Sequence, residues 1–179
     1  MEANEGKRKA WIQETIPKIQ QAVQKYRAIL YGQDESNLSL TSVLGKTWAP
    51  KGQTPQQSVT GKRGGGAAMS AISPRGSLLF TLHEKRMASP EIIHFLEQLL
   101  KHHPRRHLVT VMDQASPHTS KKTQAFVARQ KRLHVFHLPA YSPDFNPDEQ
   151  VWNHLKHQEL KSHHRPQRKS NSRDWPAVG

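Results

Sequence analysis

Three acidic residues stand where elements of secondary structure are expected to begin or end, and together they could bind metal ions. Asp113 follows the apolar run 108–112, Glu149 follows an Asn-Pro pair, and Asp34 comes shortly after the apolar run 28–31. A buried strand that ends in an aspartate delivers its carboxylate to the sheet edge where open α/β folds hold ligands. Three such carboxylates could converge on divalent cations, which promote cleavage of phosphodiester bonds.

Each of these acids also has an interpretation without chemistry. Asn146 is a good N-cap, so Glu149, three residues later, can complete a capping box. Asp113 must be hydrogen-bonded, paired or metal-bound, because burying a lone carboxylate is costly. Asp34 is followed by Glu35, and consecutive strand residues point to opposite faces. Only one of these two acids is therefore expected to share a pocket with Asp113.

The composition indicates a polyanionic partner. Among 179 residues there are 27 Lys and Arg against 14 Asp and Glu, a net charge of +13 with neutral histidine. Such an excess favours nucleic acid, because each phosphate contact releases counterions. A ribosomal or structural basic protein would share this charge. The chain has no cysteine, which excludes disulfides and zinc-thiolate sites. With no apolar run near 20 residues, we expect no membrane segment and a cytoplasmic, nucleoid-associated protein.

The N-terminal half is expected to contain one helix and several strands. Residues 8–25 show helical spacing of apolar residues, with Pro17 tolerable near a helix start. Residues 27–33 are short and apolar enough for a buried strand, and residues 38–45 suggest another. Residues 67–72 and 78–82, separated by a proline-initiated turn, predict a hairpin.

The C-terminal half alternates helices and strands. A helix is expected from a cap at Ser89, a strand over 107–113, a helix over 120–129, a strand over 133–138 and a helix from residue 146. Strands first, then helix, strand, helix, strand and helix, give a mixed α/β sheet, antiparallel on one side and parallel on the other. This is the order of the ribonuclease H-like fold. We expect a helical lead-in over 1–25, a catalytic domain over 26–160 and a disordered basic tail over 161–179.

The histidines and lysines add a second group of candidates. Most of the 12 histidines lie in basic segments and are expected to be surface residues. His118 differs because it follows Asp113 on the same loop, where it could contact a phosphate or order the loop. Further contacts to the DNA backbone are expected from Lys121, Lys122 and Lys156 and from the cations of the tail.

Four segments carry a resemblance to a known family. They are Asp34-Glu35, residues 44–55, Val111-Met-Asp113 with His118, and Leu138-Pro-Ala-Tyr-Ser-Pro-Asp-Phe-Asn-Pro-Asp-Glu149-Gln-Val-Trp. Over about residues 10–160 the chain resembles the catalytic domain of bacterial insertion-sequence transposases of the mariner superfamily. The last segment is the most specific of the four. Gln114 departs from the pattern, since family members often have asparagine there.

The resemblance implies an activity and its cofactors. Asp34, Asp113 and Glu149 would be the catalytic triad and would hold two Mg²⁺ ions, with Mn²⁺ as a substitute. The 35 residues between the last two, 114–148, agree with the spacing in the family. The implied partners are double-stranded DNA, as transposon ends and as target, and a second copy in a homodimer. Because helix-turn-helix domains usually precede this domain, a separate recognition chain is also expected.

Two rival functions remain open at this stage. A non-catalytic DNA-binding fragment could occupy DNA or inhibit a full-length transposase, and it would need no metal. A host ribonuclease or resolvase of the same fold would act on other substrates, such as RNA–DNA hybrids.

Overall fold

The computed structural model describes residues 5–39, 65–84 and 87–155, apart from the side chains of residues 38 and 39. The helices are α1 (Glu5–Ala10), the π-helical turn η1 (Trp11–Thr15), α2 (Ile16–Tyr26), α3 (Ser89–His102), α4 (Ser116–Thr119), α5 (Lys121–Arg129), the 3-10 turn η2 (Pro143–Phe145) and α6 (Pro147–His154). The strands are β1 (Ile29–Ser39), β2 (Gly65–Ile72), β3 (Leu78–His83), β4 (Leu108–Met112) and β5 (Leu133–His137).

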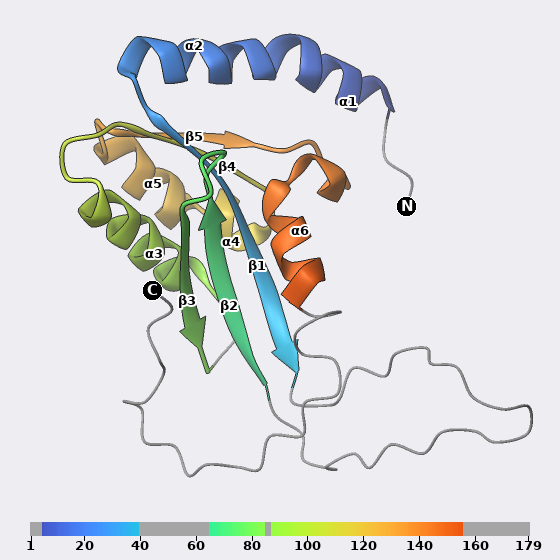
Figure 1. Cartoon of the computed structure of the whole chain (residues 1–179), viewed down its shortest axis with the longest axis vertical. Helices are drawn as coiled ribbons and strands as arrows, with labels where there is room; N and C mark the ends of the chain where they lie inside the picture. The colour runs from blue at the N-terminus through green and yellow to red at the C-terminus, as the bar shows by residue number, and fades with distance from the viewer. Residues whose placement is uncertain (1–4, 40–64, 85–86, 156–179) are drawn as a thin grey trace, which may run out of the picture.

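The five strands form one mixed sheet in the order β3-β2-β1-β4-β5. Neighbouring strands are antiparallel in the pairs β1–β2 and β2–β3, and parallel in the pairs β1–β4 and β4–β5. This confirms the mixed sheet expected from the order of elements. Because β1, β4 and β5 run the same way, their carboxyl ends lie toward one edge of the sheet and their amino ends toward the opposite edge. Figure 1 shows β3, β2 and β1 side by side in this sheet.

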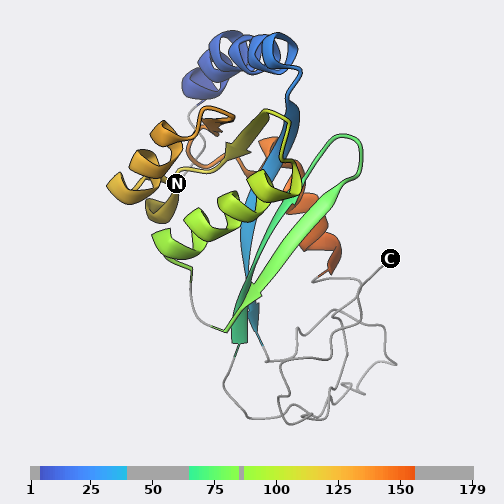
Figure 2. The same cartoon turned by 90° about the vertical axis from the view of Figure 1, so that its left-hand side faces the viewer.

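Helices cover both faces of the sheet. On one face, α3 and α5 pack against alternate strand residues that include Tyr31, Met69 and Leu108. On the other face, Ile19 of α2 packs against Val109. The helix α6 lies on that second face against β1 and β2, as Figure 2 shows. Successive side chains of a strand point to opposite faces of the sheet, so alternate residues are expected to be buried on opposite faces.

Several element boundaries differ from the sequence predictions. Strand β1 continues to Ser39, so Leu38 belongs to it; residues 40–45 of the separate strand expected over 38–45 lie outside the described residues. The first helix is interrupted by the π-helical turn before Pro17. The α3 N-cap is Ala88 rather than Ser89, whose hydroxyl instead donates to the Ser120 hydroxyl. The expected tail over 161–179 lies outside the described residues.

No helix in the described part of the chain combines the length and the apolar composition needed to cross a membrane.

Candidate active site

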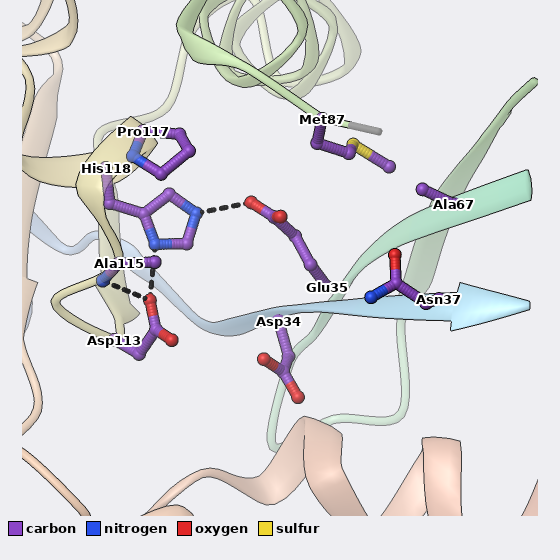
Figure 3. A pocket seen from close by; sticks show the side chains of 9 residues that line it. All are labelled: Asp34, Glu35, Asn37, Ala67, Met87, Asp113, Ala115, Pro117 and His118. Carbon is purple, nitrogen blue, oxygen red and sulfur yellow. Dashed lines mark hydrogen bonds and ion pairs between the residues drawn. The ribbon is translucent and has the colours of Figure 1, made fainter. Parts of the chain in front are cut away.

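The register of the parallel strands brings the first two acids of the proposed triad to one edge. The last residue pair between β1 and β4 joins Gly32 to Val111, so β1 continues beyond β4 at Asp34 and Glu35. Asp113 leaves the sheet directly after β4 ends. A pocket of about 220 Å³ lies there, lined in part by Asp34, Glu35 and Asp113 (Figure 3).

The expectation that only one of Asp34 and Glu35 shares a pocket with Asp113 is wrong. Both side chains line the pocket. Their side chains do point to opposite faces of β1, as the strand period requires. The pocket nevertheless reaches both, because it lies beyond the end of β4, where that neighbouring strand no longer separates the two faces.

Helix α6 carries the third acid, and its first residues are anchored on β1. The Asn146 side-chain amide donates to the Gln33 carbonyl at 3.2 Å, and its oxygen accepts from the Asp148 backbone N–H. A Cβ on Gly32 would lie 2.6 Å from Cγ of Pro147, so only glycine allows this close approach. Asn146 and Pro147 therefore fix the start of α6 against β1, and with it the position of Glu149 beside Asp34.

Asp148 is a fifth acid at this edge, after Asp34, Glu35, Asp113 and Glu149, and no role for it was apparent from the sequence. It is fully buried, and its Oδ2 accepts a hydrogen bond of 2.7 Å from the Ser70 hydroxyl. Burial and, to a smaller extent, the charge of Glu149 raise its pKa to about 6 against the effect of the Ser70 hydrogen bond. Its position next to Glu149 in the first turn of α6 was the available signal.

The environment of Asp34 disfavours its ionised form. Burial and, in decreasing order, the charges of Glu149, Asp148 and Asp113 together raise the pKa of Asp34 to about 7. Like charges in a partly buried site disfavour ionisation of each neighbour. A divalent cation would remove that penalty, and carboxylate oxygens are the ligands that Mg²⁺ prefers. The donor set therefore fits such an ion.

His118 connects two of the acids from the α3 side of the sheet. Its side chain is buried, with Nδ1 at 2.6 Å from Oδ1 of Asp113 and Nε2 at 2.8 Å from Oε1 of Glu35 (Figure 3). The Ala115 N–H also donates to Oδ1 of Asp113, at 2.9 Å. Both donors thus use the same oxygen of Asp113, which fixes the rotation of its carboxylate.

The two contacts of His118 differ in quality. The Asp113 contact is a short hydrogen bond, whereas Oε1 of Glu35 has no aligned hydrogen-bond donor, so that contact is an ion pair by proximity. Although burial opposes protonation, the two carboxylates raise the pKa of His118 to about 9. The protonated ring and the Ala115 N–H in turn lower the pKa of Asp113 against the effect of burial. His118 is therefore an imidazolium at neutral pH.

The N-terminal helical segment braces the turn that leads into α6. The Trp11 indole N–H donates to the His137 carbonyl at 2.8 Å, and the indole stacks on Phe145 with ring centroids 5.4 Å apart. The Arg8 guanidinium lies over Phe145 and forms an ion pair with Asp144, with Nη1 2.9 Å from Oδ1. The lead-in helix thus holds η2, the turn directly before Asn146.

The capping-box alternative for Glu149 is not what the structure shows. In a capping box the Glu149 carboxylate would accept from the Asn146 N–H. That N–H instead donates to the Pro143 carbonyl at 2.8 Å. The half-exposed Glu149 side chain is therefore available for another role.

The acids are near one another without forming a closed ligand set. Within residues 5–39, 65–84 and 87–155, no three His, Asp or Glu side chains are placed so that they could hold one metal ion. The arrangement is a cluster of like charges, and its role as a metal site remains a proposal.

The residues predicted to contact DNA fall in three different settings. Lys121 and Lys122 are exposed at the start of α5, next to the loop of the pocket. Lys156 lies outside the described residues. His118 is only 3% exposed and both of its ring nitrogens face carboxylates, which favours a role in ordering the site over contact with a phosphate. Gln114, on the same loop, donates to the Leu138 carbonyl and ties this loop to the end of β5.

Several solved structures share this fold. The Mos1 strand transfer complex matches with a TM-score of 0.67 and 16% identity over 93% of this chain and 52% of that chain. The Mos1 mariner paired end complex with Mn has a TM-score of 0.65 and 17% identity over 91% and 52%. The Mos1 transposase catalytic domain with raltegravir and Mn has a TM-score of 0.59 and 14% identity over 92% and 78%. The fold is therefore ribonuclease H-like.

The chain spans about half the length of the Mos1 chains in the transpososome complexes. No relative was found among curated proteins. The sequence itself matches one family, described as DDE superfamily endonuclease, over residues 29–171. This match covers most of the chain, including all three acids of the proposed triad, and the chain therefore belongs to the DDE endonuclease superfamily.

Proposed function

We propose that this chain is the catalytic domain of a mariner-type transposase of a bacterial insertion sequence, which cleaves and joins DNA phosphodiester bonds. One observation carries the proposal: Asp34, Glu35 and Asp113 line one pocket at the carboxyl ends of β1 and β4, and Asn146 and Pro147 anchor the helix of Glu149 on β1 beside it. The raised pKa of Asp34 supports a functional role for this cluster of acids. Binding of divalent cations is the role that fits both the donors and the family.

The proposed roles divide the acids into ligands and supports. Asp34, Asp113 and Glu149 would hold two Mg²⁺ or Mn²⁺ ions, which when bound supply an activated oxygen nucleophile and stabilise the leaving oxygen. Asp148 would stay out of the chemistry, because its carboxylate is fully buried and bonded to Ser70. It anchors the start of α6 instead.

His118 would act on the site through Asp113. By donating to Oδ1 of Asp113, His118 holds that oxygen in place. Because the carboxylate is rigid, this also fixes the orientation of Oδ2. Its positive charge also offsets the charges of Asp113 and Glu35, and so limits the repulsion among the acids. In this role His118 is a positioning residue.

The proposed partner is duplex DNA, as transposon ends and target. The Mos1 structures are named as transposase complexes, among them one with the left transposon end. By the same resemblance, we propose a homodimer and recognition of the ends by a helix-turn-helix module. Association with the nucleoid would follow from the net charge of +13.

Metal-dependent cleavage of plasmid DNA tests the proposal. The wild-type chain with Mn²⁺ is expected to nick supercoiled plasmid at low rate and at scattered positions, because phosphate contacts hold a duplex without selecting a sequence. Chelation of the metal and Asp113→Asn should each abolish nicking. Nicking that survives in Asp113→Asn would assign it to a contaminant or to another site, and the proposal would fail.

A second candidate function is a DNA-binding remnant without activity. The observation that favours it is the absence, among the described residues, of three side chains placed to hold one metal ion. This candidate predicts that the wild type and Asp113→Asn bind DNA equally and that Mn²⁺ changes the melting temperature of neither. Metal-dependent stabilisation of the wild type alone would exclude it.

A further inference from the structure

The end of the sheet opposite the carboxylates is a cationic surface formed by four segments. These segments are 24–28, 73–77, 99–107 and 129–134, at the amino ends of the parallel strands and at the turn between β2 and β3. They contain nine Lys and Arg and four His, but no Asp or Glu. We call these four segments the cationic end.

Hydrogen bonds show that the four segments adjoin one another. The Arg106 guanidinium donates to the Arg27 carbonyl at 2.7 Å. Arg132 Nη1 donates to the carbonyls of His103 and Arg106, at 2.7 and 2.8 Å. The Tyr31 hydroxyl lies 2.8 Å from Nε2 of His103 and 3.2 Å from the Ser77 hydroxyl, which attaches the β2–β3 turn.

Within the described part of the chain, no ion pair with a carboxylate neutralises the charges of this surface. Arg106 and Arg132 bond to backbone carbonyls, which satisfy the guanidinium N–H groups without cancelling the positive charge. The same positive charges contribute to lowered pKa values of two histidines. The pKa of His103 is lowered by burial and by the charges of His102 and Arg106, and that of His134 by burial, His107 and Lys25.

Stabilisation of helix ends accounts for only part of this charge. Helices α2, α3 and α5 all end here, and cations in a last helical turn interact favourably with the helix dipole. Lys25, Lys101 and Arg129 occupy such positions. The other six cations lie in the connecting segments, outside the last turns: Arg27, Arg75, Arg105, Arg106, Lys131 and Arg132.

The chemistry of the surface distinguishes between possible partners. A protein partner would need apolar anchors, because the centres of protein interfaces are depleted of charge and enriched in aromatic residues. Of the exposed large hydrophobic side chains among the described residues, only Leu78 borders the cationic end. A phosphate backbone requires positive charge and hydrogen-bond donors and no apolar anchor. Duplex nucleic acid is the partner that fits.

We propose that the cationic end binds the backbone of duplex DNA at a place remote from the cleavage site. Asp113 lies five residues beyond Leu108 along β4, so the two ends are separated by roughly 17 Å at about 3.3 Å per residue. This surface would hold DNA away from the phosphate being cleaved, without reading its sequence. The inference concerns binding alone and stands whether or not the proposed cleavage activity is confirmed.

A pair of charge reversals tests the proposal. Arg105→Glu with Lys131→Glu changes two exposed residues of the cationic end. The matched control is Lys9→Glu with Lys18→Glu, which makes the same change of charge on exposed residues of α1 and α2. Binding to a random-sequence duplex is measured by fluorescence anisotropy over a range of salt, with EDTA present so that cleavage does not contribute.

We expect the first pair to weaken binding by about tenfold or more, and to reduce the slope of log K against log salt by about 0.9 for each phosphate that the protein no longer neutralises. The control pair should retain most of the affinity and the slope. An equal weakening of binding in both pairs would mean that only the net charge matters, and would overturn the proposal.

A measurement on the unmodified chain provides a second test that does not depend on folding of the variants. Lysine acetylation followed by mass spectrometry reports which side chains the duplex covers. Lys25, Lys101 and Lys131 should react more slowly with DNA present, while Lys9 and Lys18 should not change. Equal reactivity with and without DNA at the first three lysines would contradict binding of DNA at this end.

Discussion

The two ends of the parallel strands carry opposite charges, although they belong to the same short sheet. At the carboxyl ends Asp34, Asp113, Asp148 and Glu149 lie together, and burial, with the charges of the other three acids, raises the pKa of Asp34 to about 7. At the amino ends nine cations adjoin without a carboxylate among them. A parallel arrangement places all strand ends of one polarity together, so it separates the two groups along the strands.

The comparison shows two ways to keep like charges together. The acids are partly buried, and burial together with neighbouring negative charge raises the pKa values of Asp34 and Asp148, so a proton or a metal ion is needed as compensation. The cations are exposed, apart from the half-buried Arg132, and solvent screens their repulsion. The first arrangement suits chemistry on a bound ion, and the second suits binding of a polyanion.

The largest expected effect separates the ligands from the supports at the acidic end. Asp34→Asn should reduce metal-dependent nicking by on the order of a thousandfold, because it removes a proposed metal ligand. Asp148→Asn should reduce it less than tenfold. Since the folded pKa of Asp148 is raised to about 6, the carboxylate that is present at pH 8 is less stable in the folded chain than in the unfolded chain.

The amide in Asp148→Asn should therefore raise the free energy of unfolding by about 1 kcal/mol at pH 8, and by less at pH 4, where the wild-type carboxyl is already protonated. Plasmid nicking and thermal melts at the two pH values measure both effects. Equal loss of nicking in the two variants would remove the distinction between ligand and support.

Two glycines, one near each end, test whether placement of α6 matters for activity. Gly32→Ala puts a Cβ 2.6 Å from Pro147 and should shift the start of α6, with a loss of nicking of about 10- to 100-fold. Gly76→Ala has open space but a φ of +81°, so it should lower stability through backbone strain. We expect the second variant to keep its nicking activity when assayed below its melting temperature. A Gly32→Ala chain as active as the wild type would show that the contact with Pro147 does not position Glu149.

Two histidines, again one at each end, should respond to pH in opposite directions. The folded pKa of His118 is raised from 6.5 to about 9, so its stabilising effect is complete below pH 6.5 and is lost as the pH rises through about 9. His118→Ala should cost about 2 kcal/mol of unfolding free energy at pH 6, because it leaves two carboxylates without their cation, and less at pH 9.5.

The folded pKa of His103 is lowered, so the contribution of this residue to stability is lost as the pH falls below 6.5. The cost of His103→Ala should accordingly be smaller at pH 5 than at pH 8. Urea unfolding of both variants at these pH values gives the comparison. If the two histidines showed the same pH trend, the fields at the two ends would not be opposite.

The smallest expected effect concerns the brace on η2. Trp11→Phe keeps an aromatic ring near Phe145 but removes the hydrogen bond to the His137 carbonyl, which should cost about 1 kcal/mol of unfolding free energy. Nicking should fall only slightly, because Asn146 still anchors α6 on β1. A loss of activity as large as that of Gly32→Ala would show that the lead-in helix positions Glu149 directly.

The sequence predicts the fold well because local patterns and the order of elements agree. The apolar runs at 28–31 and 108–112 define the two central parallel strands, and Asn146-Pro147 defines the start of α6. The register between strands could not be predicted, and it is the register that carries β1 past β4. For this reason Glu35 was not expected in the pocket beside Asp34.

The supports of the site are the part that local patterns could not reveal. The contacts of His118 with Asp113 and Glu35, and the hydrogen bond from Ser70 to Asp148, join residues from different parts of the chain. Gly32 is informative only once Pro147 is known to lie against it. The cationic end is similar, since it combines four segments that are individually ordinary basic turns.

The most direct test of the metal site at the acidic end is the position of Mn²⁺ in crystals of the full chain. Anomalous scattering at the manganese edge locates the ions without assumptions about their ligands. We expect peaks within coordination distance of the carboxylates of Asp34, Asp113 and Glu149, with His118 still bonded to Asp113. Peaks only elsewhere, or none at saturating Mn²⁺ with these carboxylates ordered and apart, would contradict the assignment of this edge as the catalytic site.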